Sequence, residues 1–296
     1  MNVKKIRVMN IKDFIVKDGA KSKFKLSKIK TDDTNSFKSK DDSLIRLEKN
    51  IERLSNLQDK LYAQGKHGIV LIFQAMDTAG KDGAIKHVMS GLNPQGTSVY
   101  SFKQPSVEDL KHDYLWRANK HLPERGQIGI FNRSYYEELL VVRVHDLLKT
   151  QNIPEELITD HIWKDRYQQI NNYEQYLAEN GFLTIKLFLH ISKDEQKERL
   201  LSRIDDKSKN WKFSEADLKE RGYWQQYQDC YEELLQNTST ERNPWFIIPS
   251  DKKWFARLLI SEIIVQHLED LNLAYPNLDQ KQEVALEECK KQLLNE

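Results

Sequence analysis

The chain has 296 residues, of which 39% are hydrophobic and 31% are charged, so it can bury one large core or at most two modest ones. Its 46 Lys and Arg residues balance 45 Asp and Glu residues to a formal net charge of +1. This balance gives no overall field that would favour nucleic acid or an anionic membrane as a partner. A polyanionic ligand would therefore have to bind local clusters of basic residues.

The sequence shows no signal for export or membrane insertion. The first residues, MNVKKIRVMNIKDF, lack the apolar run and small-residue cleavage site of a secretory signal, and nowhere do about eighteen apolar residues follow one another. The two cysteines, Cys230 and Cys289, form no CxxC or Cys/His cluster of metal-ligand spacing. We therefore expect a cytoplasmic protein with free thiols and no membrane or nucleic-acid partner.

The N-terminal part of the chain changes character near Asp41. Residues 1–40 are rich in Lys, Ser and Asp and contain few large apolar groups, which predicts an extended arm with little core of its own. Apolar residues then recur at steps of three and four, which predicts a helix running towards Ala63. Its stripe fits docking against the rest of the domain better than a coiled-coil seam, although both interpretations remain open. The stripe consists of Leu44, Leu47, Ile51, Leu54, Leu57 and Leu61.

After Gly65, short apolar runs alternate with longer amphipathic stretches, which is typical of βαβ units around a parallel sheet. We therefore predict one α/β domain over residues 41–296. The charged and aromatic stretch from 204 to 237 interrupts the alternation and predicts a helical lid inserted over the edge of the sheet. The predicted strands are 68–73, 97–102, 127–131, 183–190 and 245–248; the predicted helices are 81–92, 107–121, 134–148, 165–179, 194–203 and 252–271.

The strongest chemical signal is the stretch from Gln74 to Gly83, QAMDTAGKDG, which follows a predicted strand and opens a predicted helix. Backbone N–H groups of such a loop surround phosphate oxygens, and a lysine adds a cation. Ala75 replaces the first Gly of the usual phosphate loop, and Asp82 replaces the Ser or Thr that helps hold magnesium. A bare turn with a solvated lysine is the alternative. The predicted phosphate-binding residues are Thr78, Ala79, Gly80, Lys81, Asp82 and Gly83.

A second signal, IGIFNRSYYE, places polar residues at the carboxyl end of the predicted strand 127–131, the edge where open α/β sheets bind ligands. Asn132 stands where many phosphate-loop enzymes have a magnesium-binding Asp. We therefore predict that Asp77 and Glu137 hold a divalent metal ion and that Arg133 faces the transferring phosphoryl group. The alternative is that Arg133 and Glu137 form an ordinary i,i+4 helix salt bridge.

Basic residues outside these two motifs form a third, weaker signal. A basic and aromatic run in the predicted lid suits a polyphosphate chain, although alternating charges often mark only a solvated helix face. Lys103 follows the second predicted strand, and Arg117 lies on the next helix. The histidines show no HExxH pattern and no Ser/His/Asp arrangement has recognisable spacing, so hydrolase and zinc functions are not indicated. The lid residues predicted to bind a polyphosphate chain are Arg199, Arg203, Lys209 and Lys212.

From about Leu44 to Tyr275 the chain resembles the second polyphosphate kinase family, the polyphosphate:nucleotide phosphotransferases. Four segments carry the resemblance: FQAMDTAGKDGAIKHVMSGLNPQG, IGIFNRSYYEE, SRIDDKSKNWKFSEADLKER and NPWFIIPSDKKWFARL. The resemblance implies a thymidylate-kinase-like P-loop fold, a three-layer α/β/α arrangement with a mainly parallel sheet and a helical lid. It also implies reversible transfer of the terminal phosphate of inorganic polyphosphate to AMP or ADP, with Mg²⁺ or Mn²⁺ as cofactor and ATP as a product.

Individual residues match the family's motifs. Asp77 and Lys81 match its metal-linked carboxylate and phosphate-binding lysine, and Arg133 matches its strand-end arginine. Arg199 and Arg203 match its lid arginines. Asn132 departs from the Asp of many members. With the following Tyr-Tyr-Glu, this departure resembles the subclass that phosphorylates both nucleoside mono- and diphosphates.

Two other functions remain open from the sequence. An ATP-dependent nucleoside monophosphate kinase would need the same loop, metal and lid. An inactive polyphosphate- or nucleotide-binding module would keep the basic residues, but Asp77 and Glu137 argue against it because binding alone does not require metal-organising carboxylates. The resemblance further implies a homodimer or homotetramer and leaves room for guanine nucleotides as substrates.

Overall fold

A single parallel sheet organises the computed structural model, which describes residues 9–17, 24–35, 37 and 39–296. Within these residues the sheet has five strands in the order β2-β3-β1-β4-β5, and every neighbouring pair is parallel. The predicted strands are all present, with ends within two residues of those predicted. The strands are β1 (Gly68–Ala75), β2 (Thr97–Ser101), β3 (Ile128–Asn132), β4 (Phe182–His190) and β5 (Trp245–Pro249).

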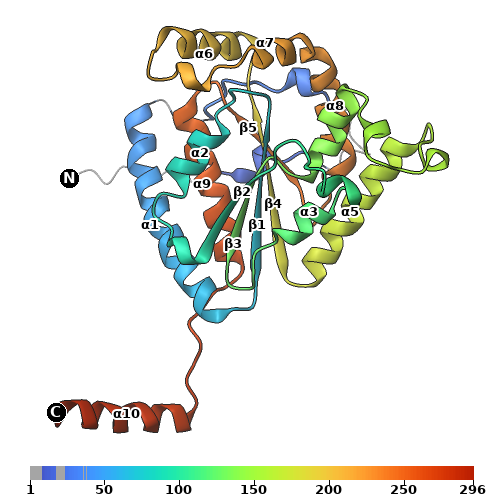
Figure 1. Cartoon of the computed structure of the whole chain (residues 1–296). Helices are drawn as coiled ribbons and strands as arrows, with labels where there is room; N and C mark the ends of the chain where they lie inside the picture. The colour runs from blue at the N-terminus through green and yellow to red at the C-terminus, as the bar shows by residue number, and fades with distance from the viewer. Residues whose placement is uncertain (1–8, 18–23, 36, 38) are drawn as a thin grey trace.

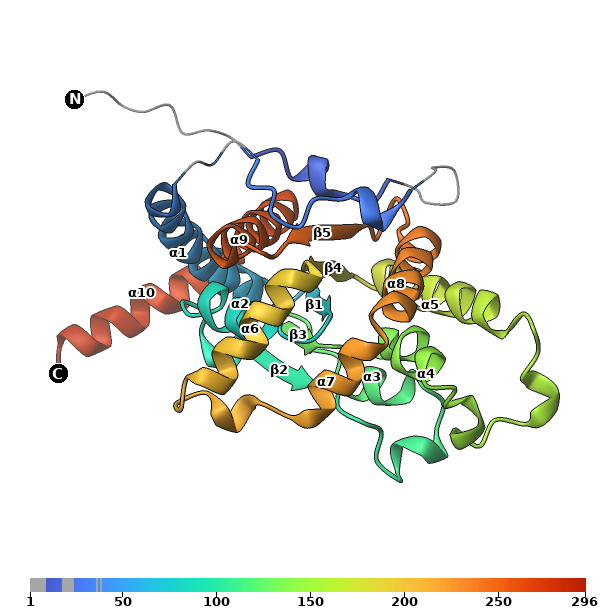
Figure 2. The same cartoon turned by 90° about the horizontal axis from the view of Figure 1, so that it is seen from above.

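Helices cover both faces of the sheet, which confirms the predicted three-layer α/β/α fold (Figure 1). The view from above shows α1, α2 and α9 on one face and α3, α4, α5 and α8 on the other (Figure 2). Because both faces are covered, β1 is buried along its whole length. These helices are α1 (Lys40–Gln64), α2 (Lys81–Val88), α3 (Trp116–Lys120), α4 (Val141–Val144), α5 (Ile162–Glu179), α8 (Trp224–Thr238) and α9 (Lys253–Asp270).

The apolar stripe of α1 docks against α9 and buries Leu47, Leu54 and Leu61. In the middle of this contact the buried amide of Asn50 donates hydrogen bonds to Ser261 Oγ at 2.9 Å and to Glu262 Oε1 at 2.7 Å. The buried polar side chains Asn50, Ser261 and Glu262 of this contact are therefore partners of one another. The docking interpretation of the stripe is confirmed.

Two long predicted helices, 107–121 and 134–148, are instead broken into short pieces. Local side chains compete for the backbone: Ser106 N–H donates to the Asp109 carboxylate at 2.8 Å, and Ser134 Oγ accepts from Tyr136 N–H at 3.2 Å. Leu140, with φ −115° and ψ −87°, separates the two pieces of the second segment. Short 3₁₀ turns result, namely η4 (Asp109–Lys111), η5 (Tyr135–Leu139) and η6 (Leu148–Thr150); η3 (Pro94–Gly96) and η7 (Glu155–Leu157) lie in other connections.

A helical lid lies over the carboxyl ends of the strands, at the top of Figure 1. It consists of α6 (Lys193–Asp205), η8 (Asn210–Lys212) and α7 (Glu215–Gly222). The predicted lid, 204–237, extends too far, because α8 belongs to the core: it buries Tyr231, Leu234 and Leu235. The Tyr231 ring packs 4.4 Å from that of Phe188 in β4.

The predicted arm, residues 1–40, lies partly outside the described residues. In the described parts, Ile15 pairs with Phe246 in an antiparallel bridge, and Val16 N–H donates to Trp245 O at 2.9 Å. Phe14, Val16 and Leu26 are buried in the main core. The arm therefore covers the outer edge of β5 and adds to the core of the domain. It contains the turns η1 (Ile11–Phe14) and η2 (Leu26–Lys28).

The last helix, α10 (Gln280–Leu294), stands apart from the sheet domain (Figure 1). All of its side chains are exposed. Among the described residues, no helix is both long and apolar enough to cross a membrane. Cys230 and Cys289 are free thiols, as predicted; the structure buries the first and exposes the second.

Candidate active site

The loop between β1 and α2 has the backbone of an anion-binding turn. Thr78 and Gly80 adopt left-handed conformations, with φ of 62° and 106°. Gly80 caps α2 without a side-chain hydrogen bond, so first-turn amides of this helix stay available to a ligand. A Cβ at Gly80 would be strained at this φ and would lie 3.6 Å from the Arg199 guanidinium. The sequence predicted this loop correctly as a glycine-dependent turn.

Lys81 is buried at the start of α2 and points back under the loop. Its ammonium donates to Ala75 O at 3.0 Å. Burial, followed by the charge of Arg133, lowers the pKa of Lys81 to about 8, although Asp77, Glu137 and Asp82 oppose the shift. A bound phosphate would add negative charge beside this ammonium and favour its protonated form.

The end of β3 turns its side chains towards the same loop. Arg133 has a left-handed backbone with φ 63°, and its N–H donates to Phe73 O at the end of β1 at 3.0 Å. The guanidinium donates to Asp77 Oδ1 at 2.8 Å. Asn132 Nδ2 donates to Asp82 Oδ1 at 2.8 Å. The structure thus brings the two predicted motifs together across neighbouring strands.

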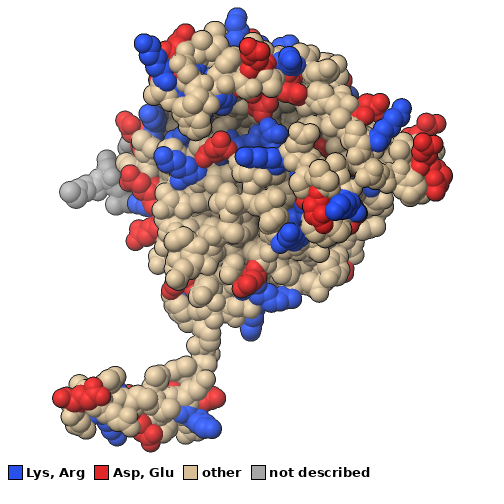
Figure 3. Space-filling model, viewed as in Figure 1, with Lys and Arg blue, Asp and Glu red and all other residues tan. Residues whose placement is uncertain are grey.

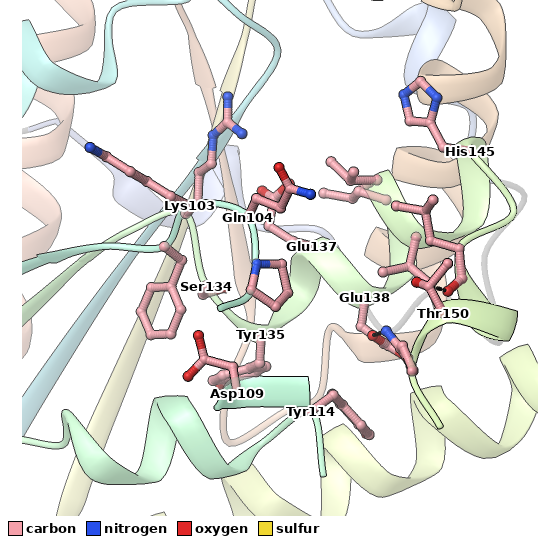
Figure 4. Close-up of a pocket in the computed structure, with 18 of the residues that line it drawn as sticks. Lys103, Gln104, Asp109, Tyr114, Ser134, Tyr135, Glu137, Glu138, His145 and Thr150 are labelled. Atoms are coloured by element: carbon pink, nitrogen blue, oxygen red, sulfur yellow. Dashed lines mark hydrogen bonds between the residues drawn. The ribbon is translucent and has the colours of Figure 1, made fainter. Parts of the chain in front are cut away.

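Glu137 lies on the 3₁₀ turn η5 rather than on an α-helix. The Arg133 guanidinium hydrogen-bonds Asp77, so the ordinary i,i+4 helix salt bridge is not formed. The charge of Glu137 is nevertheless the largest cause that raises the pKa of Arg133, with Asp77 acting in the same direction. Glu137 lines a large cavity and lies beside Gln104 in Figure 4. Arg133 therefore lies between two carboxylates, both of which face open space.

Two adjoining cavities meet at these residues. The loop cavity, of about 770 Å³, lies between the phosphate loop, the lid and the first turns of α9. The large cavity, of about 1380 Å³, lies beside it between η4, η5, α4 and α7. Both are lined by Asp77, Phe102, Lys103, Gln104, Arg133 and Asp217.

The two cavities differ in charge. The loop cavity is lined by nine Lys and Arg residues and by five Asp and Glu residues. The large cavity is lined by six Lys and Arg residues and by seven Asp and Glu residues. Figure 3 shows Lys and Arg interspersed with Asp and Glu over the face of the molecule that it draws. The sequence is nearly neutral overall, so a polyanionic ligand would have to bind a local cluster of basic residues. The loop cavity is such a cluster. It is lined by Lys81, Lys103, Arg133, Arg199, Arg203, Lys209, Lys212, Lys253 and Arg257.

The large cavity combines aromatic rings with carboxylates (Figure 4). Tyr114, Tyr227 and Tyr231 line it together with Glu137 and Glu138. Figure 4 shows Glu138 on the far side from Lys103, where its carboxylate accepts from Gln151 Nε2 at 2.7 Å. Burial raises the pKa of Glu138. Such a lining suits a planar, hydrogen-bonding organic group better than a bare anion.

Two arginines that were predicted to bind a ligand donate hydrogen bonds to backbone carbonyls of this chain. Arg199 is 7% exposed and makes hydrogen bonds through each guanidinium nitrogen, to Glu195 and to four backbone carbonyls. Its donors are already used by these hydrogen bonds, so the predicted contact with a polyphosphate chain would require at least one of them to break. Arg117 donates to Lys103 O at 2.8 Å and lies over the Phe102 ring at 5.1 Å, so it supports the strand-end loop that carries Lys103.

The other predicted lid residues line the loop cavity. Arg203 donates to Asp217 Oδ2 at 3.2 Å, Lys209 pairs with Asp206, and the Lys212 ammonium lies 5.0 Å from the Trp211 ring. The pair of Lys209 and Asp206 is half-exposed and therefore weak, so it can give way to a phosphate chain, whereas Asp217 is only 18% exposed and holds Arg203 more firmly. Thr78, Ala79, Gly80, Asp82 and Gly83 line the same cavity.

Sequence reasoning missed Lys253 and Arg257, which lie one turn apart at the start of α9 and line the loop cavity. A Cβ on Gly83 would lie 3.6 Å from the Arg257 guanidinium. Neither cation forms an ion pair within the part of the chain that the structure describes, and burial lowers the pKa of both. Two cations at the start of an otherwise apolar helix, directly after a strand, were the available signal.

The loop fits a metal ion that is bound together with phosphate. No three His, Cys, Asp or Glu side chains among the described residues form a preformed metal cluster. Magnesium often uses only one or two carboxylates and takes its remaining ligands from phosphate and water. Asp77 and Glu137 provide two, and both line the large cavity. The Thr78 hydroxyl is buried without a partner among the described residues, so the loop has an unused polar atom.

Comparison with known proteins identifies the family to which the chain is similar. The profile of the family described as Polyphosphate kinase 2 (PPK2) matches residues 37–276. The ADP-polyphosphate phosphotransferase of Rhodopseudomonas palustris is 49% identical over 97% of this chain and 100% of its own length. The AMP/ADP-polyphosphate phosphotransferase of Meiothermus ruber is 44% identical over 86% of this chain and 92% of its own.

A solved structure gives the same result for the fold. The crystal structure of Polyphosphate Kinase 2 from Arthrobacter aurescens TC1 superposes with a TM-score of 0.82 at 39% identity, covering 92% of this chain and 97% of that one. The resemblance seen in the sequence motifs is therefore confirmed over nearly the whole length. This chain belongs to the polyphosphate kinase 2 family.

Proposed function

We propose that this enzyme transfers the terminal phosphate of inorganic polyphosphate to nucleoside mono- and diphosphates. The observation that carries the proposal is the meeting of two unlike cavities at Asp77 and Arg133. One is basic and bounded by a phosphate loop, and the other is lined by aromatic rings. The names of the Rhodopseudomonas and Meiothermus relatives, which mention ADP and AMP/ADP, support the same pair of substrates.

The loop cavity is the proposed polyphosphate site. Each internal phosphate of the chain carries negative charge, and nine cations line this cavity against five carboxylates. Lys81 and the amides of the loop hold the terminal phosphate. The remaining phosphates of the polyphosphate chain are bound by further cations that line the same cavity, namely Arg203, Lys209, Lys212, Lys253 and Arg257.

The large cavity is the proposed nucleotide site. A nucleoside needs a surface for its base and room for its ribose, and the tyrosine-lined space of about 1380 Å³ provides both. The phosphate of the nucleotide then points towards Arg133 and Lys103, which the two cavities share. Adenine nucleotides are the proposed substrates, with guanine nucleotides as a further possibility to assay.

The proposed transfer is direct. A nucleotide phosphate oxygen attacks the terminal phosphorus of polyphosphate in line, the new P–O bond forms, and the bond to the bridging oxygen breaks and leaves a chain shortened by one phosphate. The attacking oxygen is already anionic, so no strong base is needed. Arg133 and Lys81 stabilise the charge on the transferring group. The reaction is reversible because a phosphoanhydride is broken and another is formed.

Asp77 and Glu137 are the residues that would hold the divalent metal, Mg²⁺ or Mn²⁺. Bound there, a divalent ion would supply positive charge that offsets the charge of the phosphates. Without a cation, Asp77 would repel a phosphate bound in the loop. Arg133 partly offsets this repulsion through its 2.8 Å ion pair with Asp77.

The decisive assay supplies the protein with Mg²⁺ and long-chain polyphosphate, together with either AMP or ADP, and measures the ADP and ATP formed. A parallel reaction replaces polyphosphate with ATP as the donor to AMP. We expect product from both acceptors with polyphosphate. Turnover with ATP but not with polyphosphate would instead identify an ATP-dependent monophosphate kinase, and no turnover with either donor would identify a binding module.

A further inference from the structure

Side chains of helix α6, on the lid side, donate hydrogen bonds to the backbone of the phosphate loop. Gln196 Nε2 donates to Asp77 O at 3.0 Å. Arg199 Nη1, one turn further along the helix, donates to Thr78 O at 3.0 Å and to Ala79 O at 2.9 Å. Three consecutive carbonyls of the loop are therefore held by two side chains of a single helix.

Both side chains are buried, and their hydrogen-bonding groups are occupied by protein partners. Gln196 is 2% exposed and Arg199 is 7% exposed. Arg199 Nη2 also donates to Ser250 O at 2.5 Å and to Asp251 O at 3.3 Å, just after β5, and its Nε donates to Glu195 at 2.8 Å. The guanidinium thus ties the loop after β1 to the end of β5 and leaves no N–H for a ligand.

These hydrogen bonds determine which way the loop's peptide groups face. In a trans peptide the C=O and N–H point in opposite directions, and the described residues contain no cis peptide bond. Carbonyls turned towards α6 therefore turn the amides of the same peptide groups away from it. A carbonyl released from α6 could rotate towards the bound phosphate and repel it, so the hydrogen bonds keep the loop ready for an anion.

The same helix is connected to the rest of the lid. Gln196 Oε1 accepts from Arg221 Nη1 at 2.9 Å, and Arg221 belongs to α7. Arg221 also donates to Lys193 O at the start of α6 at 2.8 Å. At the other end of α6, Arg203 pairs with Asp217 of α7 at 3.2 Å. One continuous path of hydrogen bonds therefore runs from Arg221 of α7 through the side chain of Gln196 to the carbonyl of Asp77.

We propose that Gln196 and Arg199 are positioning residues for phosphoryl transfer: they fix the carbonyls of the phosphate loop and couple its shape to the lid through Arg221. They act through the loop and do not touch the polyphosphate chain. The inference rests on the proposed function for its assay. A positioning role predicts a loss of kcat that is the same for polyphosphates of every length, whereas a direct charge contact predicts a loss that depends on polyphosphate length.

The test compares Arg199→Lys and Gln196→Glu with Lys197→Gln, a matched control on the exposed face of the same helix. Lysine keeps the charge of Arg199 but cannot reach four carbonyls, and glutamate still accepts from Arg221 but cannot donate to Asp77 O. For each variant, kcat and KM are measured with polyphosphates of several defined lengths. We expect kcat to fall by about 10²-fold for Arg199→Lys and about tenfold for Gln196→Glu, equally at every chain length. Lys197→Gln should match the wild type.

Three results would overturn the proposal. The first is near-normal kcat in Arg199→Lys, since a charge contact survives that change. The second is a rise in KM that grows with chain length, which would place Arg199 on the polyphosphate. The third is loss of the native circular dichroism spectrum in both variants, which would assign the two side chains to stability alone. If the wild type uses ATP and not polyphosphate, the proposed function fails. The kcat values of the variants with ATP would still test whether the hydrogen bonds from Gln196 and Arg199 position the loop.

The link to the lid has its own measurement. Gln196→Met and Arg221→Met each remove the hydrogen bond between the two side chains, so a double-mutant cycle on kcat isolates their coupling. We expect the double variant to lose clearly less activity than the product of the two single losses. Independent, multiplicative losses would show that Arg221 does not act through Gln196.

Discussion

At the scale of single residues, Lys81 is the group whose charge the site depends on most. Burial holds its pKa at about 8 in the ligand-free protein, against 10.5 in the unfolded chain. The ammonium is therefore charged below pH 8 and becomes neutral as the pH rises through 8. Between the two pKa values the unfolded chain binds more protons, so folding stability increases with pH there while phosphate binding weakens.

Activity should follow this titration. We expect kcat/KM for polyphosphate to be flat near pH 7 and to fall about tenfold per pH unit well above pH 8. Lys81→Arg keeps its charge in this range, so its lower activity should lack the alkaline decline. Lys81→Ala should lose about 10²-fold or more at all pH values. A wild-type profile that stays level to pH 9.5 would contradict the assignment.

The contact between Asn132 and Asp82 makes a second prediction at this scale. Asn132→Asp would place two carboxylates at hydrogen-bonding distance in place of the present 2.8 Å amide contact. We expect the free energy of unfolding in EDTA to fall by about 1–3 kcal/mol, and Mg²⁺ to restore part of it. Asn132→Ala, which adds no charge, should show no Mg²⁺ dependence. Equal thermal stability of Asn132→Asp with and without Mg²⁺ would count against the prediction.

At the scale of elements, a buried ion pair shapes the segment between Arg133 and Glu137. Lys186 in β4 and Glu174 in α5 are almost fully buried, with Nζ and Oε2 2.7 Å apart. Glu174 Oε1 also accepts from the hydroxyls of Tyr135 at 2.8 Å and Tyr136 at 2.7 Å. These two tyrosines open the turn η5, two residues after Arg133, so the ion pair helps to fix this turn and the position of Glu137.

Removing one partner should therefore be severe. Glu174→Leu leaves the Lys186 ammonium buried without its counter-charge, and we expect the free energy of unfolding in urea to fall by about 3–5 kcal/mol. Glu174→Leu combined with Lys186→Met should be more stable than Glu174→Leu alone. Tyr173→Phe is a matched control on the same helix, because its hydroxyl makes only a 3.4 Å contact with Asn119. A loss below about 1 kcal/mol for Glu174→Leu would refute the argument.

The sequence predicted the elements that repeat a simple pattern and missed those set by contacts between distant residues. Apolar runs located the five strands, and the glycine-lysine turn located the phosphate loop. The interruptions inside 107–121 and 134–148 depend on local side-chain hydrogen bonds such as that of Ser134, which periodicity does not register. The role of Arg199 depends on carbonyls about 120 and 50 residues away, which no local pattern encodes.

At the scale of the whole molecule, the fold places two cavities at the carboxyl edge of one sheet, and residues of the lid line both of them. β1 and β3 are adjacent, so the loops that follow them meet although about fifty residues separate them. The exposed helix α10 carries Leu286 and Leu293 away from this site, at 56% and 69% exposure. We expect a homodimer or homotetramer, which light scattering of the full chain would test.

The central claim is that polyphosphate and nucleotide occupy the two cavities and meet between Lys81 and Arg133. A crystal structure with ADP and a non-transferable, methylene-bridged polyphosphate analogue tests it most directly. We predict a phosphate chain in the loop cavity with its end beside Lys81 and Arg133, and the nucleoside among the tyrosines of the large cavity. Phosphates bound elsewhere, with the loop empty and Lys81 still on the carbonyl of Ala75, would contradict the account.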